Sequence, residues 1–208
     1  MTATFQFRAG TVANSPVLLP LPDRGTTTLR SLMRFCHRAC PGVPILIPGI
    51  EKLRSGAPID NEKIADRLAL LISEAVKAHG LSMIPIILVG HADGADLAAQ
   101  LALRHGSLVA ACILLLPATE ASNVPLATLD GLHILIIVSK CKEGSVAVGQ
   151  QISDVLQELG AAVICERVPR RRSLGPFETA IARVFIAALF GDDWPPRSAR
   201  MVLPGDVL

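Results

Sequence analysis

The chain is poor in the features that mark nucleic-acid-binding and membrane-spanning proteins. Aromatic residues make up only 3% of its 208 residues, and 20 basic side chains are nearly balanced by 18 acidic ones. Apart from one local run of arginines within 167–172, this composition offers nucleic acid neither a stacking surface nor a basic one. No stretch reaches the roughly 18 uncharged apolar residues that a membrane-spanning helix needs. We therefore expect no nucleic-acid partner and no membrane span.

The sequence also lacks the signs of secretion and of a disulfide framework. Its first ten residues contain no basic stretch followed by an apolar block, which favours a cytoplasmic protein over a secreted one. The cysteines number five, an odd count, and Cys112 and Cys165 lie in apolar runs where a reduced thiol packs well. We expect no disulfide framework and no cofactor.

What the sequence does contain is the pattern of an α/β protein. Half of its residues are hydrophobic, which is enough to form a full core in one domain. Short apolar runs alternate with amphipathic helical segments, as in a mostly parallel sheet with helices on both faces. We expect one such domain over residues 1–190, followed by a surface tail over 191–208.

The pattern assigns seven strands and five helices. The expected strands cover residues 4–7, 17–21, 44–48, 84–89, 110–116, 134–138 and 163–167. The expected helices cover residues 27–40, 60–78, 93–104, 145–159 and 176–190. Apolar spacing predicts buried faces on the last two helices, made of Val148, Ile152, Val155 and Leu159, and of Ile181, Val184, Phe185 and Leu189.

One segment places a strand, a sharp turn and a helix in immediate succession. Residues 86–98 read IILVGHADGADLA, with Gly90 and Gly94 on either side of Ala92. A Cβ at either glycine would crowd the strand and the helix where they meet. This arrangement is typical of a nucleophile elbow.

Three further segments, together with the elbow, resemble one known protein family. With the elbow, the sequence resembles the α/β-hydrolase superfamily, and within it the small carboxylesterase and phospholipase group that includes dienelactone-hydrolase-like proteins. The likeness covers roughly residues 3–190 and also rests on residues 16–19, 103–105 and 160–163. It implies an α/β-hydrolase fold.

The resemblance implies a catalytic triad that this chain does not reproduce. The family's serine nucleophile corresponds to Ala92, whose methyl group has no proton to lose and no lone pair to donate. At the position of the family's acid only Glu143 could substitute. The base loop has Arg172 where the family has histidine, and no histidine follows His133. The family's oxyanion-hole segment is replaced by residues 20–25. The chain therefore differs from the family at the nucleophile, the acid, the base and the oxyanion hole.

These departures favour a homologue without serine-hydrolase activity that binds a ligand or a partner. The ligand would be a small acyl or anionic molecule, and the partner another protein or a second copy of the chain. Arg170, Arg171 and Arg172 are candidate anion-binding residues at the rim of the cleft, although such a run is also typical of a solvated loop. The alternative is a carboxylesterase or thioesterase with displaced catalytic residues, or with a serine-to-alanine substitution at position 92.

Two elbow residues beside Ala92 have candidate roles of their own. His91 is expected to point into the fold as a structural residue rather than to act as a base. Asp93 falls one place past the apex, where an aspartate nucleophile would need glycines that the sequence does not have. Its expected role is a negative charge at the helix N-terminus.

The remaining candidates are cysteines. Cys36, His37 and Cys40 have metal-like spacing but lack a second ligand pair, so ordinary packing is expected. Cys141 lies between two lysines, which would lower the pKa of a reactive thiol if both ammonium groups were close. No histidine is near it in the sequence, and we expect no catalytic role.

Overall fold

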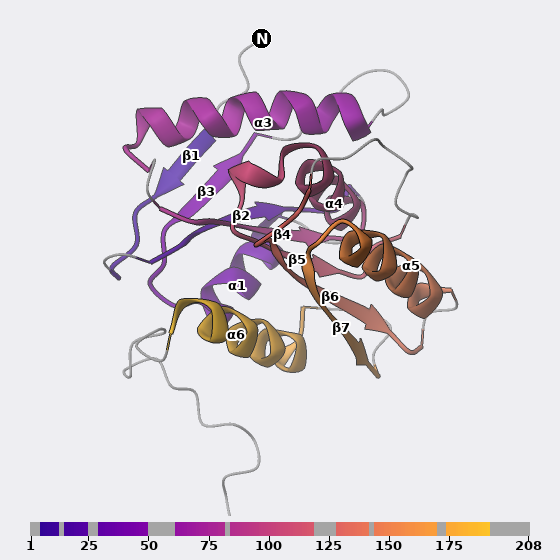
Figure 1. Cartoon of the computed structure of the whole chain (residues 1–208). Helices are drawn as coiled ribbons and strands as arrows, with labels where there is room; N and C mark the ends of the chain where they lie inside the picture. The colour runs from indigo at the N-terminus through magenta and orange to yellow at the C-terminus, as the bar shows by residue number, and fades with distance from the viewer. Residues whose placement is uncertain are drawn as a thin grey trace, which may run out of the picture.

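The chain folds into a seven-stranded sheet with helices on both faces, as seen in a computed structural model (Figure 1). The structure describes residues 5–12, 15–24, 29–49, 61–81, 84–118, 128–141, 144–169 and 174–191. The expected tail lies outside these residues except for Gly191, and the division into a domain and a tail stays a prediction.

The sheet is parallel except at one edge. Its order is β1-β3-β2-β4-β5-β6-β7, and only β1 runs antiparallel to its neighbour, β3. The strands are β1 (Phe5–Arg8), β2 (Val17–Leu21), β3 (Ile45–Pro48), β4 (Ile86–His91), β5 (Ala111–Leu115), β6 (His133–Ser139) and β7 (Ala162–Val168). Strands β2, β4 and β5 are buried along their whole length, because helices cover both of their faces. The α/β fold class agrees with the sequence pattern.

Five α-helices and one short 3-10 helix accompany the strands in the described residues. They are α1 (Leu29–Ala39), α3 (Asn61–Ala78), α4 (Asp93–His105), η1 (Gly106–Leu108), α5 (Ser145–Glu158) and α6 (Pro176–Phe190). Figure 1 shows α3, α4 and α5 on one face of the sheet and α1 and α6 on the other. Each face therefore has its own hydrophobic core, the first formed with α3, α4 and α5 and the second with α1 and α6. Among the described residues, no helix is long and apolar enough to cross a membrane.

The predicted buried faces of α5 and α6 are partly wrong. On α5, Ile152 is buried as expected, but Val148, Val155 and Leu159 are only half-buried. The rest of the buried face consists of Ser145, Gly149, Ser153 and Leu156. Small residues face the sheet because the helix lies close to it: a Cβ built on Gly149 would be 2.2 Å from Cγ1 of Val138. On α6, Val184 is 69% exposed, and Ala182, Phe185 and Ile186 form the packed face.

An ion-pair cluster joins α3 to the end of α4, far along the helix from the turn at Ala92. Nε and Nη2 of Arg104 donate to the two carboxylate oxygens of Asp66, both at 2.8 Å, and Nη1 reaches Oε2 of Glu62 at 3.3 Å. Nε2 of His105 lies 2.7 Å from Oδ1 of Asp66. The hydrogen bonds from Arg104, and then from His105, lower the pKa of Asp66 from 3.8 to about 2. This cluster gives the arginine and histidine at 104–105 a structural role.

We expect Asp66→Asn to destabilise the protein at neutral pH by about 1 kcal/mol, because the Asp66 side chain is 44% exposed and solvent screens the pair. The folded-state pKa is depressed, so the stabilisation is present above pH 3.8 and is lost as the pH falls through about 2. Urea denaturation of both proteins across this pH range measures the difference. A difference that stayed constant down to the lowest pH would show that the carboxylate charge is not its source.

Candidate functional site

The turn between β4 and α4 consists of a single residue, Ala92. Its backbone has φ 48° and ψ −119°, a conformation that residues with a side chain rarely adopt. The Ala92 N–H donates to the carbonyl of Leu115 at 2.8 Å, and the Ala92 carbonyl accepts from Ala95 at 2.7 Å and Asp96 at 3.1 Å. These bonds to both the sheet and the helix hold the strained residue in place. Such strain, about 1–3 kcal/mol, is concentrated at functional sites.

Gly90 and Gly94 allow the strand and the helix to meet at this turn. A Cβ on Gly90 would lie 2.4 Å from the carbonyl oxygen of Gly94 and 2.5 Å from Cα of Ala95. A Cβ on Gly94 would lie 1.9 Å from the carbonyl oxygen of Leu21, at the end of β2. The obstacles are backbone atoms, which cannot move aside as a flexible side chain can. Both glycines are therefore required by close backbone approach.

A second strained residue lies at the same edge of the sheet. Leu116, directly after β5, has φ 53°, and its N–H donates to the carbonyl of Ile137 at 2.8 Å. Two residues further on, the N–H of Ala118 donates to Oδ1 of Asp96 at 3.0 Å, and Asp96 is buried in the first turns of α4. Asp96 thus links the turn at Ala92 to the turn after the neighbouring strand. The carboxyl edge of β4 and β5 forms one fixed unit.

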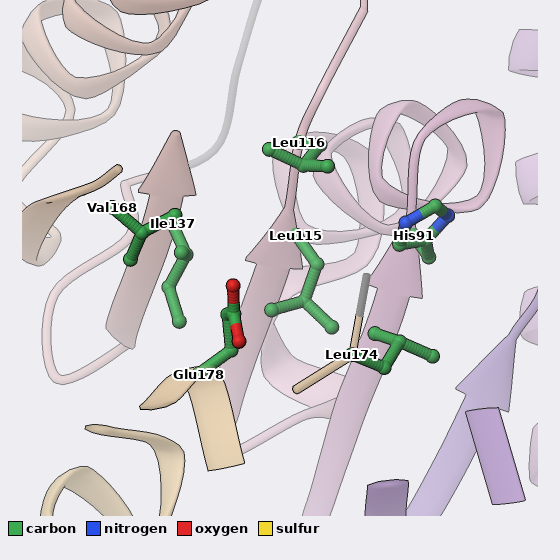
Figure 2. Close-up of a pocket in the computed structure, with 7 residues that line it drawn as sticks. All are labelled: His91, Leu115, Leu116, Ile137, Val168, Leu174 and Glu178. Atoms are coloured by element: carbon green, nitrogen blue, oxygen red, sulfur yellow. The ribbon is translucent and has the colours of Figure 1, made fainter. Parts of the chain in front are cut away.

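A small cavity opens beside this unit, on the face of the sheet that α6 covers. Its volume is only about 10 Å³ for the centre of a water-sized sphere, so it has room for about one water molecule. Figure 2 shows the seven residues that line it, namely His91, Leu115, Leu116, Ile137, Val168, Leu174 and Glu178. They come from the carboxyl ends of β4, β5, β6 and β7 and from the start of α6. His91 and Glu178 supply the polar groups, and both side chains are buried.

The outer side of the turn carries an ion pair. Asp93 is in the first turn of α4, and its Oδ2 lies 3.1 Å from Nε of Arg24. Arg24 comes from the segment after β2, where the resemblance implies an oxyanion hole. Both side chains are about 40% exposed, so the pair lies at the surface. Asp93 therefore has two favourable electrostatic contacts, with the guanidinium and with the helix N-terminus.

Histidines are placed mostly at the opposite edge of the sheet. All five belong to the described residues, and only His91 is at a strand's carboxyl end. The others are His37 near the end of α1, His79 just after α3, His105 at the end of α4 and His133 at the start of β6. Helix ends that lead into parallel strands lie at the amino edge of the sheet. These four imidazoles are therefore remote from Ala92.

Several predicted site residues fall outside the described residues. Glu143 and the arginines at 170–172 are among them, so their place relative to Ala92 stays a prediction. In the segment after β6, Ser139 is buried, and its Oγ accepts from the N–H of Cys141 at 3.1 Å. Cys141 itself is exposed.

The Cys36, His37 and Cys40 cluster does not converge on one point. Cys36 in α1 and Cys40 just after it are both buried in the core, whereas His37 is exposed on the outer side of the helix. Burial raises the pKa of Cys36 to about 12, which disfavours the thiolate that metals bind. In the part of the chain that the structure describes, no three histidine, cysteine or acidic side chains gather as a metal site would require. All five cysteines are free.

Sequence reasoning missed Arg24, Leu116 and Glu178. A signal existed for Glu178, because a glutamate three residues after Gly175, with Pro176 between them, is typical of a helix start. Its burial against the strand ends depends on tertiary packing and has no local signal. The same holds for the contact between Arg24 and Asp93, which are 69 positions apart in the chain by their numbering.

Comparison with solved structures identifies the fold. A carboxylesterase from Mesorhizobium loti has a TM-score of 0.77 at 24% identity, covering 89% of this chain and 94% of that one. A Bacillus cereus carboxylesterase has 0.78 at 19%, with the same coverages. A dienelactone hydrolase from Anabaena variabilis has 0.65 at 15%, covering 90% and 91%. No protein-family model and no curated protein matches the sequence. The chain has an α/β-hydrolase fold.

Proposed function

We propose that this protein is an α/β-hydrolase homologue that binds a small ligand in its cleft and does not hydrolyse esters by a serine mechanism. The observation that carries the proposal is the methyl group of Ala92 at the apex of the strained turn. In this interpretation the turn is a nucleophile elbow whose central residue cannot attack a carbonyl carbon. The strained geometry remains, and the reactive group is missing.

The positions of the histidines support the same proposal. A serine hydrolase needs an imidazole within hydrogen-bond reach of its nucleophile. Four of the five histidines lie at the amino edge of the sheet, and the fifth, His91, is adjacent to Ala92 in the chain and lines the small cavity at the strand ends. Loss of a triad lowers the rate by about a millionfold, or roughly 8 kcal/mol of transition-state stabilisation. A missing base therefore removes activity even when the apex is repaired.

We expect neither the wild-type protein nor Ala92→Ser to hydrolyse p-nitrophenyl acetate or butyrate appreciably. Because no imidazole would activate the new hydroxyl, the rate should change by less than about tenfold. Release of p-nitrophenol by purified protein measures this. Ala147→Ser, on the exposed side of α5, is the matched control for a serine far from the cleft.

Two results would contradict the proposal in different ways. Robust turnover by Ala92→Ser alone would mean that a working base is present and that alanine replaces a serine. Turnover by the wild-type protein that a cleft substitution abolishes would mean an esterase with displaced catalytic residues.

A further inference from the structure

Helix α6 is apolar on its outer side as well as on the side that packs on the sheet. Among its 15 residues, the polar or charged ones are Glu178, Thr179 and Arg183. On the outer side, Phe177 is 52% exposed and Val184 is 69% exposed. A helix that is hydrophobic all round is typical of a buried position. The outer side of α6 is therefore a surface that another segment is expected to cover.

The exposed apolar side chains of α6 lie on the flank that is turned toward β7. Helices α1 and α6 pack side by side (Figure 1), α1 on β2 and α6 on β6, so the flank of α6 away from α1 is nearer to β7. Nη2 of Arg183 donates to the carbonyl of Arg38 in α1, which marks the flank facing α1. Ile181 is two positions from Arg183, so its side chain points about 200° away from it around the helix. The apolar residues near Ile181 on this flank are Phe177, Val184 and Ala188.

Strand β7 adds an exposed apolar side chain on the same face of the sheet. Ile164 is 50% exposed, and it shares a face with Val168, which is buried in the core formed with α1 and α6. Helix α6 begins with Glu178 at the carboxyl ends of the strands and reaches the end of α1 at Arg183, so its last turns approach the amino edge, where β7 begins. We name the surface formed by Ile164, Phe177, Ile181, Val184 and Ala188 the α6–β7 patch.

This patch holds most of the exposed large hydrophobic side chains. Four such side chains are exposed among the described residues, and Ile164, Phe177 and Val184 are three of them. The fourth, Leu70, is alone on α3. Single exposed apolar residues are normal, whereas a group of them marks a contact surface.

The chain that follows α6 starts at the border of the patch. Gly191 ends the helix with φ 91°, which lets the backbone leave the helix direction. Residues 192–208 read DDWPPRSARMVLPGDVL and include Trp194. Three extended residues span about 10 Å, and the seven helical residues from Val184 to Gly191 span about the same distance. A chain that folds back along α6 therefore brings Trp194 level with Val184.

We propose that residues 192–208 fold back over the α6–β7 patch, with the Trp194 side chain as their anchor. The indole packs on Ile164, Val184 and Ala188. An aromatic ring suits this contact because it buries a large apolar area and has few rotatable bonds. A segment of the same chain also loses less translational and rotational entropy on docking than a separate partner does.

The rest of the segment is long enough to cover the start of the helix as well. The apolar run Met201–Leu203 begins ten residues after Gly191, and ten extended residues span about 33 Å. The helix from Phe177 to Gly191 is only about 21 Å long. The run at 201–203 can therefore reach Phe177.

Tryptophan fluorescence tests the proposal, because Trp194 is the one tryptophan in the sequence and the chain has no tyrosine. The emission maximum and the quenching by acrylamide are measured for the full chain, native and unfolded in urea. We expect native Trp194 to emit at a shorter wavelength and to be quenched less steeply than unfolded Trp194. Both values should be independent of protein concentration, because the contact lies within one chain.

Variants on the patch assign the effect to this contact. Val184→Gln should lower the ratio of docked to free segment about tenfold and move both fluorescence values toward those of the unfolded chain. Its far-UV circular dichroism should not change, since the position is exposed and glutamine is a good helix former. Ile164→Gln on β7 should act in the same direction. Leu70→Gln is the matched control, 68% exposed on α3 at the opposite face, and should behave like the wild type.

Three outcomes would overturn the docking proposal. The first is native Trp194 that is quenched as steeply as in urea, and the second is fluorescence unchanged by both Val184→Gln and Ile164→Gln. The third is burial of Trp194 that increases with protein concentration, which would indicate that a second copy covers the patch. None of these outcomes bears on ester turnover, which tests the proposed function separately.

Discussion

Replacing Gly94 with alanine lowers the free energy of unfolding by about 3 kcal/mol or more, in our expectation. The added Cβ would lie 1.9 Å from the carbonyl oxygen of Leu21 and 2.9 Å from that of Pro22, so α4 would have to move away from β2. Overpacking against backbone, which cannot change rotamer, belongs to the severe class of substitutions. Urea denaturation followed by circular dichroism measures the loss.

Gly106→Ala is the matched control. Gly106 follows α4 with φ −53°, and among the described residues the one atom close to its Cβ position is the end of the Leu129 side chain, at 3.0 Å. We expect a change of at most about 1 kcal/mol there, since a flexible side chain can move and alanine favours helical backbone. Equal losses at both positions would show that close approach to β2 is not what requires glycine at 94.

Ala92→Val is expected to destabilise the protein by about 2 kcal/mol, and Ala92→Gly to stabilise it by up to about 1 kcal/mol. A β-branched side chain is strongly disfavoured at φ 48°, whereas glycine adopts positive φ without steric cost. The gain from glycine is limited because glycine also increases the entropy of the unfolded chain. Thermal and urea unfolding of the three proteins give the order.

A decrease in stability from glycine to alanine to valine at position 92 is the informative result for the turn. If valine at 92 were as stable as alanine, the backbone would have to relax out of the left-handed region. That outcome would remove the strain on which the interpretation of this turn depends.

The fold was largely predictable because parallel sheets leave a strong pattern. Strands β4, β5 and β6 are buried on both faces, so their sequences are continuous apolar runs that periodicity detects. The turn at Ala92 was predictable for a related reason, since two glycines between a strand and a helix indicate close backbone approach. Gly90 and Gly94 both make such approaches.

Helix faces were harder to predict, because hydrophobicity does not show how close a helix lies to its sheet. On α5, Gly149 and Ser153 are buried where valines were expected, and at Gly149 even a Cβ would come within 2.2 Å of Val138 in β6. On α6 nearly every position is apolar, so periodicity gave no clear inner face, and Val184 was assigned wrongly. The sequence pattern shows where a helix forms, but not how closely that helix packs on the sheet.

The candidate site was predictable at its centre and not at its borders. Residues 90–94 are contiguous, and their local spacing is informative. Glu178 and Arg24 come from other parts of the chain and reach the strand ends only through folding. No short-range signal encodes contacts of that kind.

The bonds that hold Ala92 also bear on protein engineering. Main-chain groups of Leu115, Ala95 and Asp96 fix the conformation at position 92, and none of these bonds involves its methyl group. A designer can therefore exchange this one side chain for another without a β-branch while the supporting main chain stays as it is. Installing a reactive group would then be a problem of supplying a proton acceptor within its reach, and not of rebuilding the backbone beneath it.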